Sequence, residues 1–328
     1  MRKNLLGRTG LEISEIALGA GVTAGILVSG SEATRRQLLR RALAAGINWI
    51  DTAPTYGDGA SEENIGQHLA SLDPQPYVST KVRIETSDMR DIPGAIERSV
   101  EGSLRRLNVQ RIALLQLHNQ LGAGVGGRPF LTTEQLLRRG GVADTFERLR
   151  VQRLIRATGI TATGDSATCI EVINSGRFDT AQVYYNALNP SAGWSRVSSQ
   201  WMAQDFSGII GACWRQNMGI LNIRVWAGGP LASSRPVDNL SVMTEGTDVD
   251  NELRCAAAIR RVLGHLYGTP AQAALRFVLG NKDLTSHIIG ISQVEFLDEA
   301  LAALNKGPLP LEAIAKLERL WATDFFSN

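Results

Sequence analysis

Four titratable residues lie at or just after the ends of three apolar runs. Asp51 closes INWID, Lys81 closes YVSTK, His118 closes IALLQLH, and Tyr56 follows Asp51 by five residues. A phenol has an ordinary pKa of about 10, but a nearby ammonium stabilises its phenolate and lowers that pKa. We interpret Asp51 as the group that holds Lys81 charged and oriented, and neutral His118 as an N–H donor to a substrate oxygen. The set suits proton delivery to a carbonyl oxygen, or removal of a hydroxyl proton in reverse.

Other kinds of catalytic chemistry find less support in the residues. An Asp or Lys after a strand is commonly a solvated cap, and a lone His is more often structural, which is how we interpret His68, His265 and His287. No H-x-x-x-H pattern or carboxylate cluster accompanies them, so no metal site is predicted and metal-dependent hydrolysis is disfavoured. No Ser or Cys stands beside a His in a recognisable pattern, so no nucleophile is predicted.

Short apolar runs alternate with amphipathic helical stretches along the whole chain. Helix start signals include Ser31-Glu32, Ser61-Glu62-Glu63 and Thr269-Pro270. Strands separated by helices are parallel, and eight such units fit a closed (β/α)8 TIM barrel, with an open doubly wound sheet as the alternative. No linker divides the chain, which predicts one domain over residues 1–328. The predicted strands are Ile13–Leu18, Ile47–Ile50, Tyr77–Val82, Ile112–Leu117, Leu154–Ile160, Thr180–Tyr185, Ile220–Trp226 and Ser286–Ile289.

Two long segments after strands do not fit this repeat. Asn119–Gly141 follows the fourth predicted strand and Gly228–Asn251 follows the seventh, as expected for loops at the C-terminal face of a barrel, where ligands bind. Tolerated insertions are the alternative. The glycines of Gly122–Gly127 satisfy G-x-G-x-x-G, but they start several residues past a strand and no helix opens behind them. We interpret that segment as a loop and not as a dinucleotide fingerprint.

Composition excludes several classes of partner. Lys and Arg number 34 against 32 Asp and Glu, and no basic run is interleaved with aromatic residues, so nucleic acid is not an expected partner. The longest uncharged stretch, Ile16–Ser31, is 16 residues long and shorter than the ~18 apolar residues of a membrane span. The N-terminus does not resemble a signal peptide, and the three cysteines form no C-x-x-C pair. A cytoplasmic protein with a small-molecule substrate is predicted, and the oligomeric state is left open.

The stretch GINWIDTAPTYG (46–57), followed by SEENIG (61–66), resembles the signature of the aldo-keto reductase superfamily. Lys81 and His118 match the remaining members of that family's catalytic tetrad. The resemblance extends from LGRTGL (6–11) to IGIS (289–292). It implies a TIM barrel closed at the bottom by an N-terminal hairpin, an extended nicotinamide cofactor bound without a Rossmann motif, and hydride transfer to or from a carbonyl carbon.

The same resemblance assigns roles to individual residues. Tyr56 would be the general acid/base, Asp51 and Lys81 would tune it, and His118 would orient the substrate. The family usually has Ser-Asn after the fifth strand, where this chain has Thr161-Ala162. It also commonly has a Tyr that stacks on the nicotinamide, for which Trp226 is the nearest aromatic residue. The cofactor contacts implied by position are Thr161 and Gln182 with Asn186 close by, Trp226, and Gly290, Ser292 and Glu299 toward the adenosine end.

The adenosine end carries a charge pattern that favours NAD over NADP. NADP-preferring members of the family often place Lys or Arg after the eighth strand, to meet the 2′-phosphate. Between Lys282 and Lys306 this chain has no other Lys or Arg, and its carboxylates Glu295, Asp298 and Glu299 would repel a phosphate. The NAD preference and the IGIS segment resemble the branch of L-galactose and D-threo-aldose 1-dehydrogenases, which oxidise an aldose at C1 to a lactone.

Three functions therefore stay open. The preferred one is oxidation of an aldose, and the alternative within the same chemistry is NADPH-dependent reduction of aldehydes or ketones. A non-catalytic regulatory subunit on the same fold is a third, because a fold does not dictate function. Candidate pocket residues in the loops are Ile26, Phe130 and Trp194.

Overall fold

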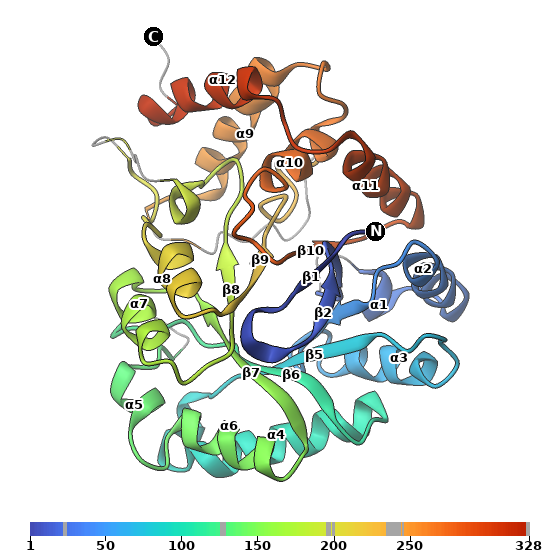
Figure 1. Ribbon diagram of the computed structural model, residues 1–328, viewed down its shortest axis with the longest axis vertical. Coiled ribbons are helices and arrows are strands. Elements are labelled where there is room, and N and C mark those ends of the chain that lie inside the picture. Colours follow the sequence, from blue (N-terminus) through green and yellow to red (C-terminus); the bar gives the residue numbers. More distant parts are fainter. Residues whose placement is uncertain are drawn as a thin grey trace.

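Eight parallel strands close into a barrel, in the order β10-β3-β4-β5-β6-β7-β8-β9, and helices surround it (Figure 1). The computed structural model describes residues 1–21, 25–124, 129–194, 198, 201–233, 244 and 246–325. The predicted (β/α)8 barrel is confirmed. Its strands are β3 (Ile16–Gly19), β4 (Trp49–Asp51), β5 (Tyr77–Val82), β6 (Ile112–Leu117), β7 (Ile155–Ala162), β8 (Thr180–Tyr184), β9 (Gly219–Ile223) and β10 (Ser286–Gly290), preceded by the hairpin strands β1 (Lys3–Leu5) and β2 (Glu12–Ser14).

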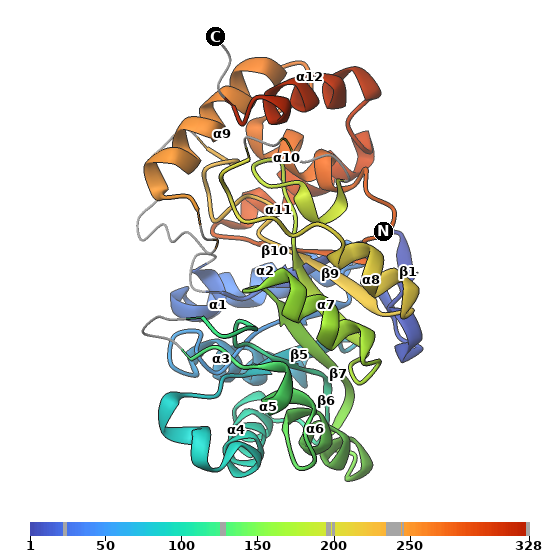
Figure 2. The same cartoon turned by 90° about the vertical axis from the view of Figure 1, so that its left-hand side faces the viewer.

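Most of the helices follow the barrel strands and cover their outer faces. In both views α9 and α12 lie together at one end of the molecule (Figure 2). The helices are α1 (Ile26–Ser29), α2 (Glu32–Ala44), α3 (Ala60–Leu69), α4 (Ile92–Leu107), α5 (Thr133–Leu137), α6 (Val142–Val151), α7 (Ser166–Asn174), α8 (Ile209–Arg215), α9 (Val249–Leu263), α10 (Pro270–Val278), α11 (Val294–Lys306) and α12 (Leu311–Ala322), with short 3-10 turns η1 (Gly7–Thr9), η3 (Thr86–Arg90) and η4 (Ser191–Gly193).

Two predicted helix starts have the expected capping contacts. The Ser31 side chain accepts a hydrogen bond from the backbone N–H of Thr34 at the start of α2. Thr269 and Gln272 cap each other at the start of α10, with Pro270 in the first turn. By contrast, α3 begins one residue before Ser61 and has Gly59 at its cap position, with a positive φ of 93°.

Two predicted strands need correction. Ile13–Leu18 is not one strand, because the chain passes at Glu15 from the antiparallel hairpin into the parallel barrel. The strand predicted to end at Trp226 ends at Ile223. Arg224 and Ala227 then adopt φ angles of 59° and 53°, and the N–H of Ala227 bonds to the carbonyl of Arg224. Trp226 consequently belongs to a turn at the barrel rim and not to a strand.

The hairpin closes the bottom of the barrel with buried apolar side chains. A two-stranded hairpin is marginal alone, so burial of its Leu6, Leu11 and Ile13 must stabilise it, at roughly 1.5–3 kcal/mol for each side chain. They form one cluster with the interior residues Ala17, Trp49, Leu114, Ala157 and Leu221.

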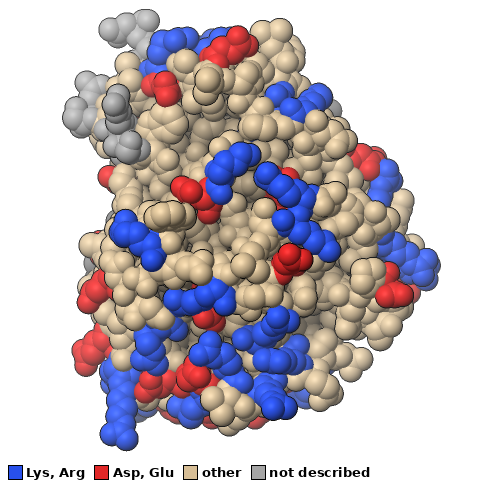
Figure 3. Space-filling model, in the orientation of Figure 1, with Lys and Arg blue, Asp and Glu red and all other residues tan. Residues whose placement is uncertain are grey.

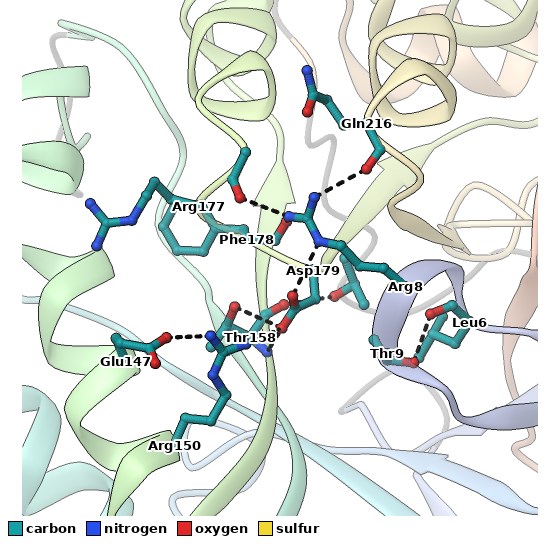
Figure 4. Close-up of polar contacts among 12 residues, drawn as sticks. Leu6, Arg8, Thr9, Glu147, Arg150, Thr158, Arg177, Phe178, Asp179 and Gln216 are labelled. Atoms are coloured by element: carbon teal, nitrogen blue, oxygen red, sulfur yellow. Dashed lines mark hydrogen bonds and ion pairs between the residues drawn. The ribbon is translucent and has the colours of Figure 1, made fainter.

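Polar contacts also fix the hairpin to the start of β8 (Figure 4). Arg8 donates to Asp179 at 3.3 Å, to the carbonyl of Gln216 at 3.1 Å and to the carbonyl of Phe178. The second oxygen of Asp179 accepts from the backbone N–H of Thr158 at 3.0 Å and lies 3.5 Å from Arg150. The carboxylate therefore joins the hairpin, β7 and α6 at the bottom of the barrel.

Acidic and basic side chains are interspersed on the face of the molecule shown in Figure 3. Ion pairs join neighbouring helices, including Arg41 with Asp298 and Arg148 with Glu97. Exposed pairs of this kind contribute little stability. Within the described ranges, no helix combines the length and apolar character needed to cross a bilayer.

Candidate active site

A cavity of about 730 Å³ opens where the barrel strands end. Residues at or just after the C-terminal ends of the strands line it, from Gly19 through Asp51, His118 and Thr161 to Gly290. The two long loops also contribute, through Gln120 and Pro129 after β6 and through Gly228, Gly229 and Thr244 after β9. The C-terminal rim of the barrel is thus the candidate active site, as the sequence predicted. Gly126, Gly127 and residues 234–243 of these loops lie outside the described residues.

Asp51, Lys81 and Tyr56 meet at the floor of this cavity. The Nζ of Lys81 donates to Oδ2 of Asp51 at 2.6 Å, to the carbonyl of Thr52 at 2.8 Å and to the phenol oxygen of Tyr56 at 3.1 Å. An ammonium has three donors, and each of them is used here. Lys81 therefore cannot change its position without breaking one of these bonds.

Lys81 is held in its charged form. Its side chain is 1% exposed, and burial lowers the pKa of an amine. The neighbouring Asp51 carboxylate and the Tyr56 phenol outweigh this effect, so that the pKa of Lys81 is raised above its ordinary value. The site consequently keeps a positive charge beside the phenol oxygen at neutral pH.

His118 lies beside Tyr56 in the lining of the cavity. The two ring centroids are 5.8 Å apart with an edge-to-face angle of 84°, and both residues line the cavity. The structure therefore brings all four predicted catalytic residues together, with both Lys81 and His118 in contact range of Tyr56.

Most of the predicted cofactor residues line the same cavity, namely Thr161, Gln182, Trp226, Gly290, Ser292 and Glu299. Asn186 is not among the described lining residues, and its side chain instead bonds the backbone of Arg224, Leu188 and Asn189. The indole of Trp226 donates to the carbonyl of Ala271 at 3.0 Å, which holds the ring at the rim.

The residues present fit a nicotinamide cofactor. The hydroxyl oxygen of Thr161 is buried and makes no hydrogen bond with any described residue, so it is available to a ligand amide. At the other end of the cavity α11 begins. The side chain of its cap residue, Gln293, makes no hydrogen bond to the backbone N–H groups of the first turn of the helix. A helix N-terminus whose N–H groups have no side-chain cap can bind phosphates, and Gly290 and Ser292 line the cavity directly before this helix.

Sequence reasoning missed three contacts to Asp51. Its Oδ1 accepts from Ser79 at 2.7 Å, from the amide of Gln182 at 2.9 Å and from the amide of Gln116 at 3.1 Å. The available signal was strand alternation, because Ser79 stands two residues before Lys81 and must face the same way. Gln182 thus contacts the Asp51 carboxylate, a bond that the resemblance alone did not suggest.

The proposed loop residues do not form the pocket. Ile26, Phe130 and Trp194 are absent from the described lining residues, whose aromatic members include Trp226 and Phe296. Trp194 packs instead against Trp321, with ring centroids 5.2 Å apart. Aromatic type alone could not distinguish a pocket side chain from one in the packing between helices.

The other histidines lie away from the cavity. His68 and His287 are buried, as a structural role requires, but His265 is exposed, so packing does not explain it. In the part of the chain that the structure describes, no three His, Cys, Asp or Glu side chains gather as a metal site would need.

Comparison with known proteins identifies the family. The profile described as Aldo/keto reductase family matches residues 15–322. L-galactose dehydrogenase of Arabidopsis thaliana is 23% identical over 310 residues, covering 92% of this chain and 87% of that protein. A probable voltage-gated potassium channel subunit beta of Oryza sativa is 26% identical, covering 97% and 96%. Aldo-keto reductase YhdN of Bacillus subtilis is 35% identical over 125 residues, which are 36% of this chain and 38% of that relative.

Solved structures share the fold. The holo form of aldo-keto reductase AKR11C1 from Bacillus halodurans superposes with a TM-score of 0.73 at 21% identity, covering 98% of this chain and 96% of that one. An aldo-keto reductase from Klebsiella pneumoniae in complex with NADPH has a TM-score of 0.67 at 20% identity, with the same coverage. The chain belongs to the aldo/keto reductase family and is an NAD(P)-dependent oxidoreductase that acts on carbonyl groups.

Proposed function

We propose that Tyr56 is the general acid and base of this enzyme and that it works on the C1 hydroxyl of an aldose. The observation that carries the proposal is the position of the Lys81 ammonium, 3.1 Å from the phenol oxygen and 2.6 Å from the Asp51 carboxylate. A bound nicotinamide supplies the hydride acceptor for oxidation, or the hydride donor for reduction. All proton handling falls to residues of the chain.

In the oxidation direction Tyr56 acts as the phenolate. The Lys81 ammonium stabilises this form, and the phenolate takes the proton of the sugar hydroxyl as C1 is oxidised to a lactone. A ring N–H of His118 donates to the same substrate oxygen and holds it against the phenol. Reduction of a carbonyl runs the same proton path in reverse, with the phenol as donor.

The lining of the cavity favours a polar substrate. Arg83 follows Lys81 by two residues, Gln120 follows His118 by two, and both line the cavity at the rim where Tyr56 and His118 lie. Such side chains suit the hydroxyls of a sugar better than an apolar aldehyde. The similarity to L-galactose dehydrogenase along most of the chain supports the same substrate class.

For the cofactor we propose a preference for NAD, on the charge of the adenosine end. Glu299 lines the cavity there, and its carboxylate accepts a hydrogen bond from Thr269. The neighbouring Asp298 forms an ion pair with Arg41, so the guanidinium of Arg41 is already paired with a carboxylate. The NADPH bound in the Klebsiella pneumoniae structure favours the opposite choice. Titration of both cofactors by fluorescence quenching distinguishes the two, since equal or tighter NADP binding would refute the preference.

The similarity to a potassium channel subunit beta supports a second candidate, a regulatory subunit on the same fold. The assembled Asp51, Lys81, Tyr56 and His118 favour catalysis. The test is a panel of aldoses, aldehydes and ketones, assayed by nicotinamide absorbance with NAD and NADP. Aldose oxidation that Tyr56→Phe abolishes supports the proposal. Turnover of aldehydes or ketones alone would replace the substrate class, and no turnover with tight cofactor binding would favour the regulatory function.

A further inference from the structure

A chain of buried hydrogen bonds runs from the bottom of the barrel to the catalytic phenol. The indole N–H of Trp49 donates to the hydroxyl of Ser79 at 2.9 Å, and that hydroxyl lies 2.7 Å from Oδ1 of Asp51. The other oxygen of Asp51 accepts from Lys81, whose ammonium reaches Tyr56. Trp49 itself packs among the apolar side chains that close the bottom of the barrel.

The direction of these bonds is fixed by chemistry. An indole N–H can only donate, so the Ser79 oxygen must accept from Trp49 and its own proton is left for another acceptor. Two acceptors are near, Oδ1 of Asp51 at 2.7 Å and the carbonyl of Ile50 at 3.4 Å. The shorter bond to a charged oxygen is the stronger one. The positive end of the hydroxyl dipole therefore points at Asp51.

Strand register places Ser79 for this contact. Asp51 and Ser79 are paired residues on the neighbouring strands β4 and β5. Lys81 is two residues further along β5, so it faces the same side, one layer nearer the rim. Asp51, Ser79 and Lys81 are all fully or almost fully buried, so solvent does not compete for these bonds.

We propose that Ser79 is a positioning residue for proton transfer at Tyr56. Its hydroxyl, oriented by Trp49, holds the Asp51 carboxylate in the rotamer that keeps the Lys81 ammonium on the phenol oxygen. This inference rests on Tyr56 as the acid and base of the proposed function. It adds a residue that acts through Asp51 and touches neither substrate nor cofactor.

Ser79→Ala is the direct test. The variant removes a dipole whose positive end faces the Asp51 carboxylate, so the potential at the phenol becomes more negative and the phenolate less favourable. The rising limb of kcat/KM for oxidation should move up by about half a pH unit, and kcat should fall about tenfold, as for loss of one bond to a charged group. The dissociation constant of the cofactor should stay unchanged, because Ser79 is not among the residues that line the cavity.

Thr80→Val is the matched control. Thr80 is adjacent on the same strand, is fully buried, and donates to the buried carboxylate of Glu62 at 2.5 Å. It faces the helices and not the barrel interior, so its loss removes the same kind of bond without touching Asp51. Both variants should lose stability, and only Ser79→Ala should displace the pH limb. If Ser79→Ala does not fold, Ser79→Cys keeps the side-chain volume with a weaker donor, and its limb should move in the same direction.

Three outcomes decide the matter, with the pH profile and Tyr56→Phe measured in parallel. A displaced limb in Ser79→Ala or Ser79→Cys, unmatched by Thr80→Val, supports the inference. A limb that coincides with that of the wild type, or an equal displacement in Thr80→Val, overturns the inference. If Tyr56→Phe is inactive in the same experiment, the proposed function still stands. Wild-type activity in Tyr56→Phe refutes the proposed function, and the inference with it.

Discussion

Replacement of Lys81 by Met tests the electrostatic reasoning most directly. Met keeps an unbranched chain of similar length but carries no charge and no donor, so the bonds to Asp51, Thr52 and Tyr56 are all lost. Two consequences follow, one for the phenol and one for the stability of the barrel. Because the side chain is 1% exposed, water cannot replace the ammonium.

The magnitudes follow from the distances. Opposite charges 3.1 Å apart, the Lys81–Tyr56 separation, attract by about 5 kcal/mol at an effective dielectric constant of about 20. The Asp51 carboxylate, 2.6 Å from the same nitrogen, opposes part of this. We expect the rising limb of aldose oxidation to move up by roughly one to three pH units, at about 1.4 kcal/mol for each unit. Removing one partner of a buried ion pair costs about 3–5 kcal/mol, and the bonds that remain on Oδ1 of Asp51 favour the lower figure.

The assay is kcat/KM against pH in both directions, with urea unfolding on the same preparations. The oxidation profile should fall in height and move to higher pH. Carbonyl reduction needs the protonated phenol. Its pH profile should also fall in height, and its limb should also move to higher pH. A profile that falls without any displacement would refute the reasoning, because Lys81 would then only position its neighbours. A protein that never turns over substrate would show no profile at all, which separates catalysis from a regulatory role.

Three further predictions concern single groups. Tyr56→Phe should lower kcat by about 10²–10⁴-fold, the usual size of general acid–base catalysis, while cofactor binding in a fluorescence titration is unchanged; activity within a few-fold of wild type would contradict the assignment. Thr161→Val should weaken cofactor binding by about tenfold, one hydrogen bond, without loss of melting temperature, since its buried hydroxyl has no partner among the described residues. Burial lowers the pKa of His287 to about 3. Between about pH 6.5 and pH 3 this imidazole is therefore protonated in the unfolded chain and neutral in the folded one. Its contribution to the free energy of unfolding falls by about 1.4 kcal/mol for each unit that the pH is lowered in this range. In urea unfolding His287→Gln should lose this slope, because the Gln side chain does not titrate, while its amide can still bond to the Asn222 side chain. An equal slope would refute the assignment.

The sequence predicted the barrel because alternation of strands and helices is a local pattern. One of the two failed strand predictions failed because of contacts distant in the chain. Ile13–Leu18 has one continuous apolar pattern, yet Ser14 pairs with Lys3 in the hairpin and Ile16 pairs with His287 in the barrel. Apolar character indicates that both parts are buried, but it does not indicate which neighbouring strand each part pairs with. The end of β9 was missed for a different reason, since positive φ angles at Arg224 and Ala227 have no signature in those residue types.

The candidate catalytic residues were predictable because Asp51, Lys81 and His118 lie at or next to the ends of parallel strands and Tyr56 lies in the loop after one of them, and such ends meet at one rim. Their support was harder to see. Trp49 and Ser79 are buried residues of ordinary strand composition, and the bond between them depends on strand register. Gln182 was assigned to the cofactor, and its bond to Asp51 required the structure. The candidate catalytic residues belong to a recognisable sequence motif. The residues that hold them in place have no such motif, because their contacts depend on strand register.

The role proposed for Ser79 implies that packing at the bottom of the barrel affects the chemistry at its rim. The hairpin residues Leu6 and Leu11 pack in one cluster with Trp49, and the Trp49 indole sets the direction of the Ser79 hydroxyl, which acts on Asp51. A core substitution at the bottom that tilts the indole therefore frees the Ser79 proton to turn toward the carbonyl of Ile50 at 3.4 Å. The same substitution would alter stability through the cluster and the pH dependence of turnover through Asp51. With the role proposed for Ser79, the hairpin acts on proton transfer at Tyr56 from the end of the barrel opposite to the cavity.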